Sequence, residues 1–208
     1  HRSGVDPESS LLLYLGRYLD AASFLDFRGV LTHAGESYSC RGIECIRQTA
    51  EIERSRAVHC VQRLEAAGIP CPVVSIGSTP TVTFARDLTG VTKVRAGVFL
   101  FQDLVMAGLQ VCSIDDIAVS VLATVIGHQK DKNWIIVDAG WSALSRDRGT
   151  AKQSVDYGYG LVCGFSGKPV NGLYVSSVYQ EHGVITHREN KEIIMDRFPV
   201  GRRVRILP

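Results

Sequence analysis

The chain has 208 residues, of which 45% are hydrophobic and 21% are charged, and its formal net charge is +2. This balance is typical of a globular protein with a sizeable core. The densest basic run, 202–205, alternates in a terminal strand and indicates a solvated face, whereas nucleic-acid binding calls for a broader basic stripe. No apolar run reaches the roughly 18 residues of a membrane-spanning helix, so we expect neither nucleic acid nor membrane as a partner.

Six cysteines, at positions 40, 45, 60, 71, 112 and 163, show no C-x-x-C spacing, and several lie within apolar runs. A free thiol in such a run behaves as a small core residue. The pattern therefore favours reduced cysteines in a cytoplasmic protein over a disulfide framework.

In the first half of the chain, helical and strand patterns alternate. Asp6 followed by Pro7 predicts a helix start, and leucines spaced by three and four continue that helix to position 19. After it we expect, in order, a strand over 27–32, a long helix over 43–67 ended by Gly68, a strand over 72–76, a short helical or irregular stretch over 81–90 and a strand over 94–102.

The second half is β-rich, with turn residues between its segments and no convincing helical period. We expect strands over Val111–Ser113, Ile117–Gly127, Trp134–Ala139, Leu161–Cys163, Leu173–Tyr179, Gly183–Thr186 and Val204–Leu207. The predicted organisation is an α/β part over 1–107 followed by a β domain over 108–208.

The α/β part holds too few strands for a closed eight-stranded barrel, which takes about 250 residues. An open half-barrel would leave an unpaired strand edge, which natural folds avoid. We therefore expect further residues of the molecule to precede His1.

Small residues mark two neighbouring strands of the α/β part. Gly77, Ser78 and Thr79 follow the strand over 72–76, and Gly97 and Val98 lie near the start of the strand over 94–102. Glycine lets backbone N–H groups approach an anion closely, and hydroxyls add donors. Late strands of a (β/α) barrel that end this way commonly hold a phosphate. The alternative is an ordinary turn in which Ser and Thr cap the next helix.

Several motifs occur together, in an order and spacing that resemble one family. They are HRSGV at 1–5, THAGESY at 32–38, SIGSTPT at 75–81, VRAG at 94–97, DAGW at 138–141, SRDRG at 145–149, QEHG at 180–183 and PVG at 199–201. Over essentially its whole length the chain resembles the D-serine dehydratase and D-threonine aldolase group. The resemblance implies the C-terminal part of an alanine-racemase-type (β/α)8 barrel that binds pyridoxal 5′-phosphate (PLP), followed by a β-rich domain, usually in a homodimer.

The resemblance also implies a chemistry. Family enzymes act on D-3-hydroxy amino acids, with PLP as the electron sink and a divalent metal, Zn or Mn, that polarises the 3-hydroxyl. We expect a D-serine or D-threonine dehydratase that yields a 2-oxo acid and ammonia. A D-threonine aldolase that yields glycine and an aldehyde is the close alternative. A non-catalytic PLP-binding barrel and a sugar-phosphate-binding barrel are alternatives from other classes.

Three further residues are candidates for cofactor contact. By the resemblance, Arg2 corresponds to the family arginine near the cofactor ring, and a surface arginine is the alternative. His33 ends a strand, so its imidazole could stack on the pyridine ring or pass a proton, or could be a structural group. Tyr38 in the following loop could hydrogen-bond to the cofactor or substrate, or pack the loop.

Two family features are expected to lie outside this chain. The Schiff-base lysine of the family precedes the first residue, and Lys93, the one lysine among the first 129 residues, lies at the entry of its strand. The family's metal ligands, a His-x-Cys or His-x-Asp pair, normally follow the last residue. Glu181 and His182 are adjacent and would point to opposite faces of a strand, so they do not predict a metal pair. We expect this chain alone to be inactive.

Overall fold

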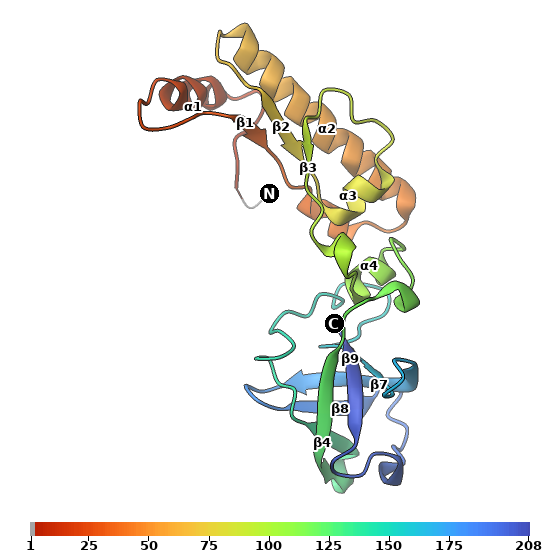
Figure 1. Cartoon of the computed structure of the whole chain (residues 1–208). Coiled ribbons are helices and arrows are strands. Elements are labelled where there is room, and N and C mark those ends of the chain that lie inside the picture. Colours follow the sequence, from red (N-terminus) through yellow and green to blue (C-terminus); the bar gives the residue numbers. More distant parts are fainter. Residues whose placement is uncertain (1–2) are drawn as a thin grey trace. The chain divides into compact units, whose positions relative to one another are not determined.

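The computed structural model describes residues 3–208, so the predicted contact of Arg2 lies outside the described residues. The chain divides into two units, His1–Phe99 and Leu100–Pro208 (Figure 1). In the first unit helices alternate with a parallel sheet, and in the second a β-barrel closes on itself. The predicted fold class, α/β followed by β, is confirmed.

The first unit is built on a three-stranded parallel sheet in the order β1-β2-β3. Its elements are α1 (Ser10–Asp20), β1 (Gly29–Leu31), α2 (Ile43–Ala66), β2 (Val73–Ile76), α3 (Thr79–Phe84) and β3 (Lys93–Val94), with a 3-10 helix at Gly35–Ser39. Ser75 is the register partner of Lys93, so the first residue of β3 lies beside the third residue of β2. The two parallel strands therefore end at the same edge of the sheet.

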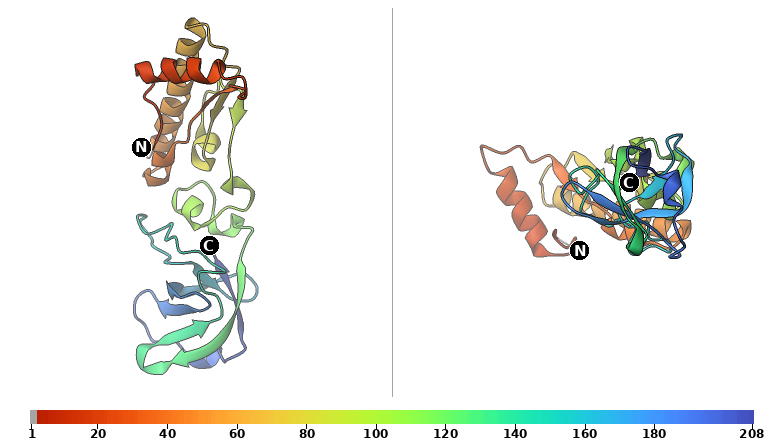
Figure 2. Two further views of the ribbon diagram at one scale, coloured as in Figure 1. Left: turned by 90° about the vertical axis from the view of Figure 1, so that its left-hand side faces the viewer. Right: turned by 90° about the horizontal axis from the view of Figure 1, so that it is seen from below.

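The long helix α2 forms the core of this unit against the sheet (Figure 1). Its buried positions recur every three or four residues, at Ile46, Ala50, Glu53, Ala57, Val61 and Leu64. Helix α1 lies across the last turns of α2 (Figure 2), where Gly16 allows the contact because a Cβ there would stand 2.5 Å from a methyl of Leu64. As predicted, α2 ends before Gly68, which takes a positive φ of 78°.

Two predicted boundaries in this unit are wrong. Helix α1 begins after Ser9, whose hydroxyl accepts from the N–H of Leu11, whereas the Asp6 carboxylate accepts from the N–H of Glu8 in the turn before the helix. The strand expected over 94–102 ends at Val94 and is followed by a 3-10 helix at Val98–Leu100. β2 ends at Ile76, so residues 96–102 have no further residues of that strand to pair with.

The expectation of six reduced cysteines is also wrong at one pair. Cys40 and Cys45 form a disulfide, because the 3-10 helix before α2 brings their Cα atoms to 5.6 Å, within the range a disulfide spans. The remaining cysteines, Cys60, Cys71, Cys112 and Cys163, are free thiols. Burial raises the pKa of Cys163 to about 11, as expected for a core thiol.

The second unit is a closed barrel with strand order β4-β5-β8-β7-β6-β9. The strands are β4 (Val121–Gln129), β5 (Trp134–Val137), β6 (Leu161–Cys163), β7 (Pro169–Val178), β8 (Gly183–His187) and β9 (Arg203–Leu207). Apolar side chains from these strands fill the interior, among them Val125, Ile135, Val175 and Ile206. Short 3-10 helices lie at Ile114–Asp116, Lys130–Lys132 and Met195–Arg197.

The second unit departs from the prediction at its beginning. Val111–Ser113 is not a strand, and a short helix, α4 (Leu104–Gly108), precedes it with Asp103 as its N-cap. Burial raises the pKa of Asp103, although the N–H groups of Met106 and Val105 oppose that shift. Across residues 3–208, no helix combines the length and apolarity that crossing a membrane would take.

Candidate functional site

A cleft of about 510 Å³ lies in the first unit, where the chain leaves the sheet. Seven of the predicted cofactor-binding residues line it: His33, Tyr38, Gly77, Ser78, Thr79, Gly97 and Val98. Val94, Arg95 and Ala96 complete its wall. The structure therefore brings residues far apart in the sequence to one place, at the carboxyl ends of parallel strands.

Gly77 is required by packing rather than by an open approach to a ligand. Its φ is +130°, and a Cβ there would stand 2.6 Å from the carbonyl oxygen of Arg95. Its N–H group donates to the buried carboxylate of Glu53 at 3.1 Å. This amide thus donates to a carboxylate within the protein, whereas the sequence had led us to expect that it faces the phosphate of a ligand.

Ser78 and Thr79 differ sharply in how their hydroxyls are used. Ser78 is the N-cap of α3, and its Oγ lies 3.0 Å from both Thr81 Oγ1 and Ser37 Oγ. The capping alternative therefore holds for Ser78. Thr79 is 1% exposed, and its Oγ1 has no hydrogen-bond partner among residues 3–208. Since buried polar atoms are nearly always paired, this hydroxyl calls for a partner that residues 3–208 do not supply.

Gly97 and Val98 also line the cleft. A Cβ built on Gly97 would meet no atom within 4 Å, so glycine is not demanded there by contacts within the protein. The open space beside this backbone is compatible with the predicted close approach of a ligand.

His33 and Tyr38 lie together in the lining of the cleft, with ring centroids 6.0 Å apart and planes tilted by 38°. His33 Nδ1 lies 3.2 Å from the carbonyl oxygen of Gly77. Because a carbonyl only accepts, Nδ1 carries the proton of this bond, and Nε2 of the neutral ring is left as an acceptor. The strand-end placement predicted for His33 is observed, two residues after β1.

The candidates taken from the sequence omitted Arg95, which lines the cleft and brings a positive charge to it. Its Nε donates to Ser75 Oγ at 2.9 Å, and its terminal nitrogen donates to the carbonyl of Thr32. The guanidinium thus spans the sheet from β3 to β1. Its place within the VRAG motif, directly after a strand, is the signal that could have identified it.

A second omitted residue is Glu53, a carboxylate that is only 6% exposed. It lies on the buried face of α2, between the buried residues Ala50 and Ala57. A charged residue at a core-facing position is a detectable signal, because such a group is rarely buried without partners.

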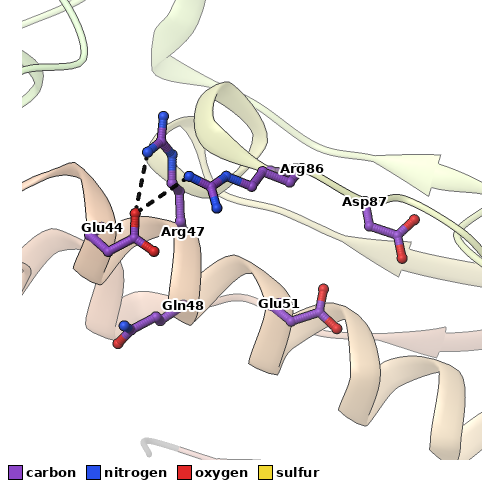
Figure 3. Close-up of a pocket in the computed structure, with 7 residues that line it drawn as sticks. Glu44, Arg47, Gln48, Glu51, Arg86 and Asp87 are labelled. Atoms are coloured by element: carbon purple, nitrogen blue, oxygen red, sulfur yellow. Dashed lines mark hydrogen bonds and ion pairs between the residues drawn. The ribbon is translucent and has the colours of Figure 1, made fainter.

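A smaller hollow of about 210 Å³ lies between α2 and the segment that follows α3 (Figure 3). Its charged side chains pair with one another: Glu44 lies 3.2 Å from Arg47 and 3.6 Å from Arg86 (Figure 3), and Arg54 lies 3.3 Å from Asp87. Such self-paired surface charges are ordinary for a solvated face and indicate no ligand.

Lys93 opens β3 as expected and does not line the cleft. Glu181 and His182 lie in the turn between β7 and β8, so the strand alternation used to separate them does not apply. The His182 ring stacks on Tyr179 at 4.6 Å. Within residues 3–208, no three His, Cys, Asp or Glu side chains are grouped so as to hold a metal ion.

Comparison with known proteins agrees with this geometry. The family "Alanine racemase, N-terminal domain" matches residues 1–104, half of the chain, and the family "Putative serine dehydratase domain" matches residues 118–208. The D-threo-3-hydroxyaspartate dehydratase of Delftia sp. (strain HT23) is 52% identical over 211 residues, which cover 100% of this chain and 55% of that enzyme. The solved structure of the Delftia enzyme matches with a TM-score of 0.93, over the same shares of the two chains.

The chain belongs to the D-serine dehydratase group of the alanine-racemase fold. A second relative in the group, the D-serine dehydratase of Dictyostelium discoideum, is 30% identical over 222 residues, 100% of this chain and 54% of that protein. The chain thus spans about half the length of these curated relatives.

Two further structures bear on the group's chemistry. The D-threonine aldolase from Filomicrobium marinum has a TM-score of 0.72 at 21% identity, covering 100% of this chain and 52% of that one, and so shares the fold alone. A solved cysteine-to-alanine variant of the Delftia enzyme, 52% identical to this chain with a TM-score of 0.92, is described as the metal-free form. The match covers 100% of this chain and 55% of that variant.

Proposed function

We propose that the whole protein is a PLP-dependent, metal-assisted lyase that dehydrates D-3-hydroxy amino acids to a 2-oxo acid and ammonia. The two curated relatives named above are dehydratases, of D-threo-3-hydroxyaspartate and of D-serine. D-3-hydroxyaspartate, D-serine and D-threonine are therefore the substrates to test first. The aldolase alternative is supported only by a shared fold.

The observation that carries this proposal is the unpaired hydroxyl of Thr79 in a cleft that also holds the Arg95 guanidinium. A phosphate oxygen would give Thr79 Oγ1 the acceptor that it lacks, through a charge-assisted hydrogen bond. The positive charge of Arg95 favours an anionic ligand in the same cleft. The open backbone at Gly97 leaves room for such a group. The residues present therefore fit a phosphorylated cofactor.

The remaining cleft residues are assigned by the same reasoning. Thr79, Gly97 and Val98 would hold the phosphate, with Ser78 fixing the turn that presents Thr79. His33 and Tyr38 would flank the aromatic ring in the cleft. When bound, PLP supplies an electron sink for negative charge at the α-carbon of the substrate.

His33 is the described side chain best placed to hold or move a proton in the cleft. Its Nδ1 is anchored on the Gly77 carbonyl, which leaves Nε2 as the acceptor of this ring. In the overall reaction the α-proton and the 3-hydroxyl leave as water, and hydrolysis of the resulting imine returns one water and releases ammonia.

The metal and the homodimer belong to the proposal for the whole enzyme. None of the described side chains forms a cluster suited to a metal, so none is assigned to one. The support for a metal is the relative described in a metal-free form. Chelation of the whole enzyme should abolish turnover, and Zn or Mn should restore it.

Product analysis of the full-length protein tests the proposal. The PLP-loaded enzyme is incubated with D-threo-3-hydroxyaspartate, D-serine and D-threonine, with the L-enantiomers as controls, and 2-oxo acid, ammonia and glycine are measured. Equal amounts of 2-oxo acid and ammonia from a D-substrate are expected. Glycine as the product would replace the dehydratase by the aldolase, and PLP binding without turnover would indicate a non-catalytic protein.

A further inference from the structure

The loops that line the cleft are joined by one buried carboxylate, that of Glu53 on α2. Its Oε1 accepts hydrogen bonds from Thr32 Oγ1 at 2.9 Å, the N–H of Ala34 at 3.1 Å and the N–H of Gly77 at 3.1 Å. Its Oε2 accepts from Thr81 Oγ1 at 3.1 Å. All four donors lie in the two segments that follow β1 and β2.

On the β1 side, the donors to Glu53 are the two neighbours of His33. Thr32 precedes the histidine and donates through its hydroxyl, and Ala34 follows it and donates through its N–H, so both neighbours of His33 are held by the same carboxylate oxygen. The direction in which His33 faces the cleft therefore depends on a side chain that does not itself line the cleft.

On the β2 side, the donors bracket the pair Ser78 and Thr79. Gly77 precedes this pair and Thr81 follows Pro80, and both donate to Glu53. The position of the orphan Thr79 hydroxyl is thus tied to the same anchor as His33.

The chemistry of a carboxylate suits this position. An ionised carboxylate only accepts, and its two oxygens can take several donors at once. An amide side chain in place of Glu53 would have one accepting oxygen, and its NH2 group would face a donor instead of an acceptor. Charge-assisted bonds to backbone N–H groups are also the stronger kind, which makes the anchor stiff.

We propose that Glu53 is a positioning residue that sets the separation and orientation of the two ends of the cofactor cleft, the ring end at His33 and the phosphate end at Thr79. The inference rests on the proposed function, because it takes PLP to be the ligand of the cleft. It goes further by assigning the geometry of that site to a residue outside it.

The test compares full-length Glu53→Gln with Glu65→Gln, an exposed glutamate on the same helix. The amide of Glu53→Gln retains an oxygen for the donors to Oε1 and reverses only the bond to Thr81, so this variant keeps the fold. Glu53→Ala would strand two buried N–H groups and is not used for that reason. Thermal unfolding is recorded, and dissociation constants for PLP and for pyridoxal, which lacks the phosphate, are measured well below the unfolding temperature.

Glu53→Gln replaces the charge-assisted bonds at both ends of the cleft by weaker neutral ones, in addition to reversing the bond to Thr81. It should therefore raise the dissociation constants of both PLP and pyridoxal by about tenfold, with altered visible circular dichroism of the bound cofactor and a cooperative unfolding transition. Glu65→Gln should match the parent in every measurement. Unchanged dissociation constants in Glu53→Gln, an effect on PLP alone, or loss of cooperative unfolding would each overturn the positioning role. Failure of the unsubstituted enzyme to bind PLP would instead overturn the proposed function, and this inference with it.

Discussion

Replacing Thr79 by Val should stabilise the empty protein and weaken its hold on PLP, two effects of opposite sign. Valine has the shape of threonine without the hydroxyl. Thr79 is 1% exposed, and none of residues 3–208 pairs with its buried Oγ1. An unsatisfied buried polar group costs about 1–3 kcal/mol, so removing it should raise the free energy of unfolding by about 1 kcal/mol.

In the complex the same hydroxyl would donate to a phosphate oxygen. Hydrogen bonds to charged groups contribute about 1.5–3 kcal/mol, which corresponds to roughly a tenfold to hundredfold rise in the PLP dissociation constant. Binding of pyridoxal should be unaffected, because it lacks the phosphate.

The assay combines chemical denaturation of the apoprotein with spectroscopic titration of PLP and pyridoxal, using the full-length enzyme. Thr83→Val is the matched control on the same helix, because the Thr83 hydroxyl is already satisfied by the carbonyl of Thr79 at 2.8 Å. The control should bind PLP normally. The reasoning is refuted if Thr79→Val destabilises the apoprotein or binds PLP as tightly as the parent.

Three further predictions follow from particular contacts. Gly97→Ala should leave the thermal unfolding temperature unchanged, because its Cβ meets nothing within 4 Å, yet weaken PLP binding; equal affinity would remove Gly97 from the site. Tryptic digestion without reductant, which cleaves after Arg41, should give two peptides linked through Cys40 and Cys45, and separate alkylated peptides would exclude the disulfide. The raised pKa of Asp103 means that its ionised form is disfavoured in the folded state, so stability is lost as pH rises from the unfolded pKa of about 3.9 through the raised value. Asp103→Asn keeps an N-cap acceptor, so its free energy of unfolding should equal or exceed that of the parent near pH 7, and the difference should vanish in acid. A loss of about 1 kcal/mol in Asp103→Asn, the loss expected for Asp103→Ala, would contradict this.

The sequence predicted what depends on local pattern. The 3–4 spacing of apolar residues and the following Gly68 located α2 to within a residue, and β6 was placed at its observed bounds. The β-rich character of the second half was predicted, whereas its closure into a barrel was not. The extent of β3 was not predictable, because its two residues are set by where β2 ends and not by the apolar run that follows Val94.

The same distinction applies to the cleft. Strand-end glycine and hydroxyl residues indicated which positions gather there, and they do. The division of labour between Ser78, which caps α3, and Thr79, whose hydroxyl is unpaired, depends on three-dimensional contacts that no spacing encodes. Glu53 contributes through hydrogen bonds to two segments distant from it in sequence, so its partners emerge only from the fold.

The most direct test of the account is a crystal structure of the full-length enzyme with PLP bound. The account predicts a phosphate oxygen about 2.7 Å from Thr79 Oγ1, beside the backbone of Gly97 and Val98, with the pyridine ring near His33. A phosphate bound elsewhere, with the Thr79 hydroxyl still unpaired, would contradict it.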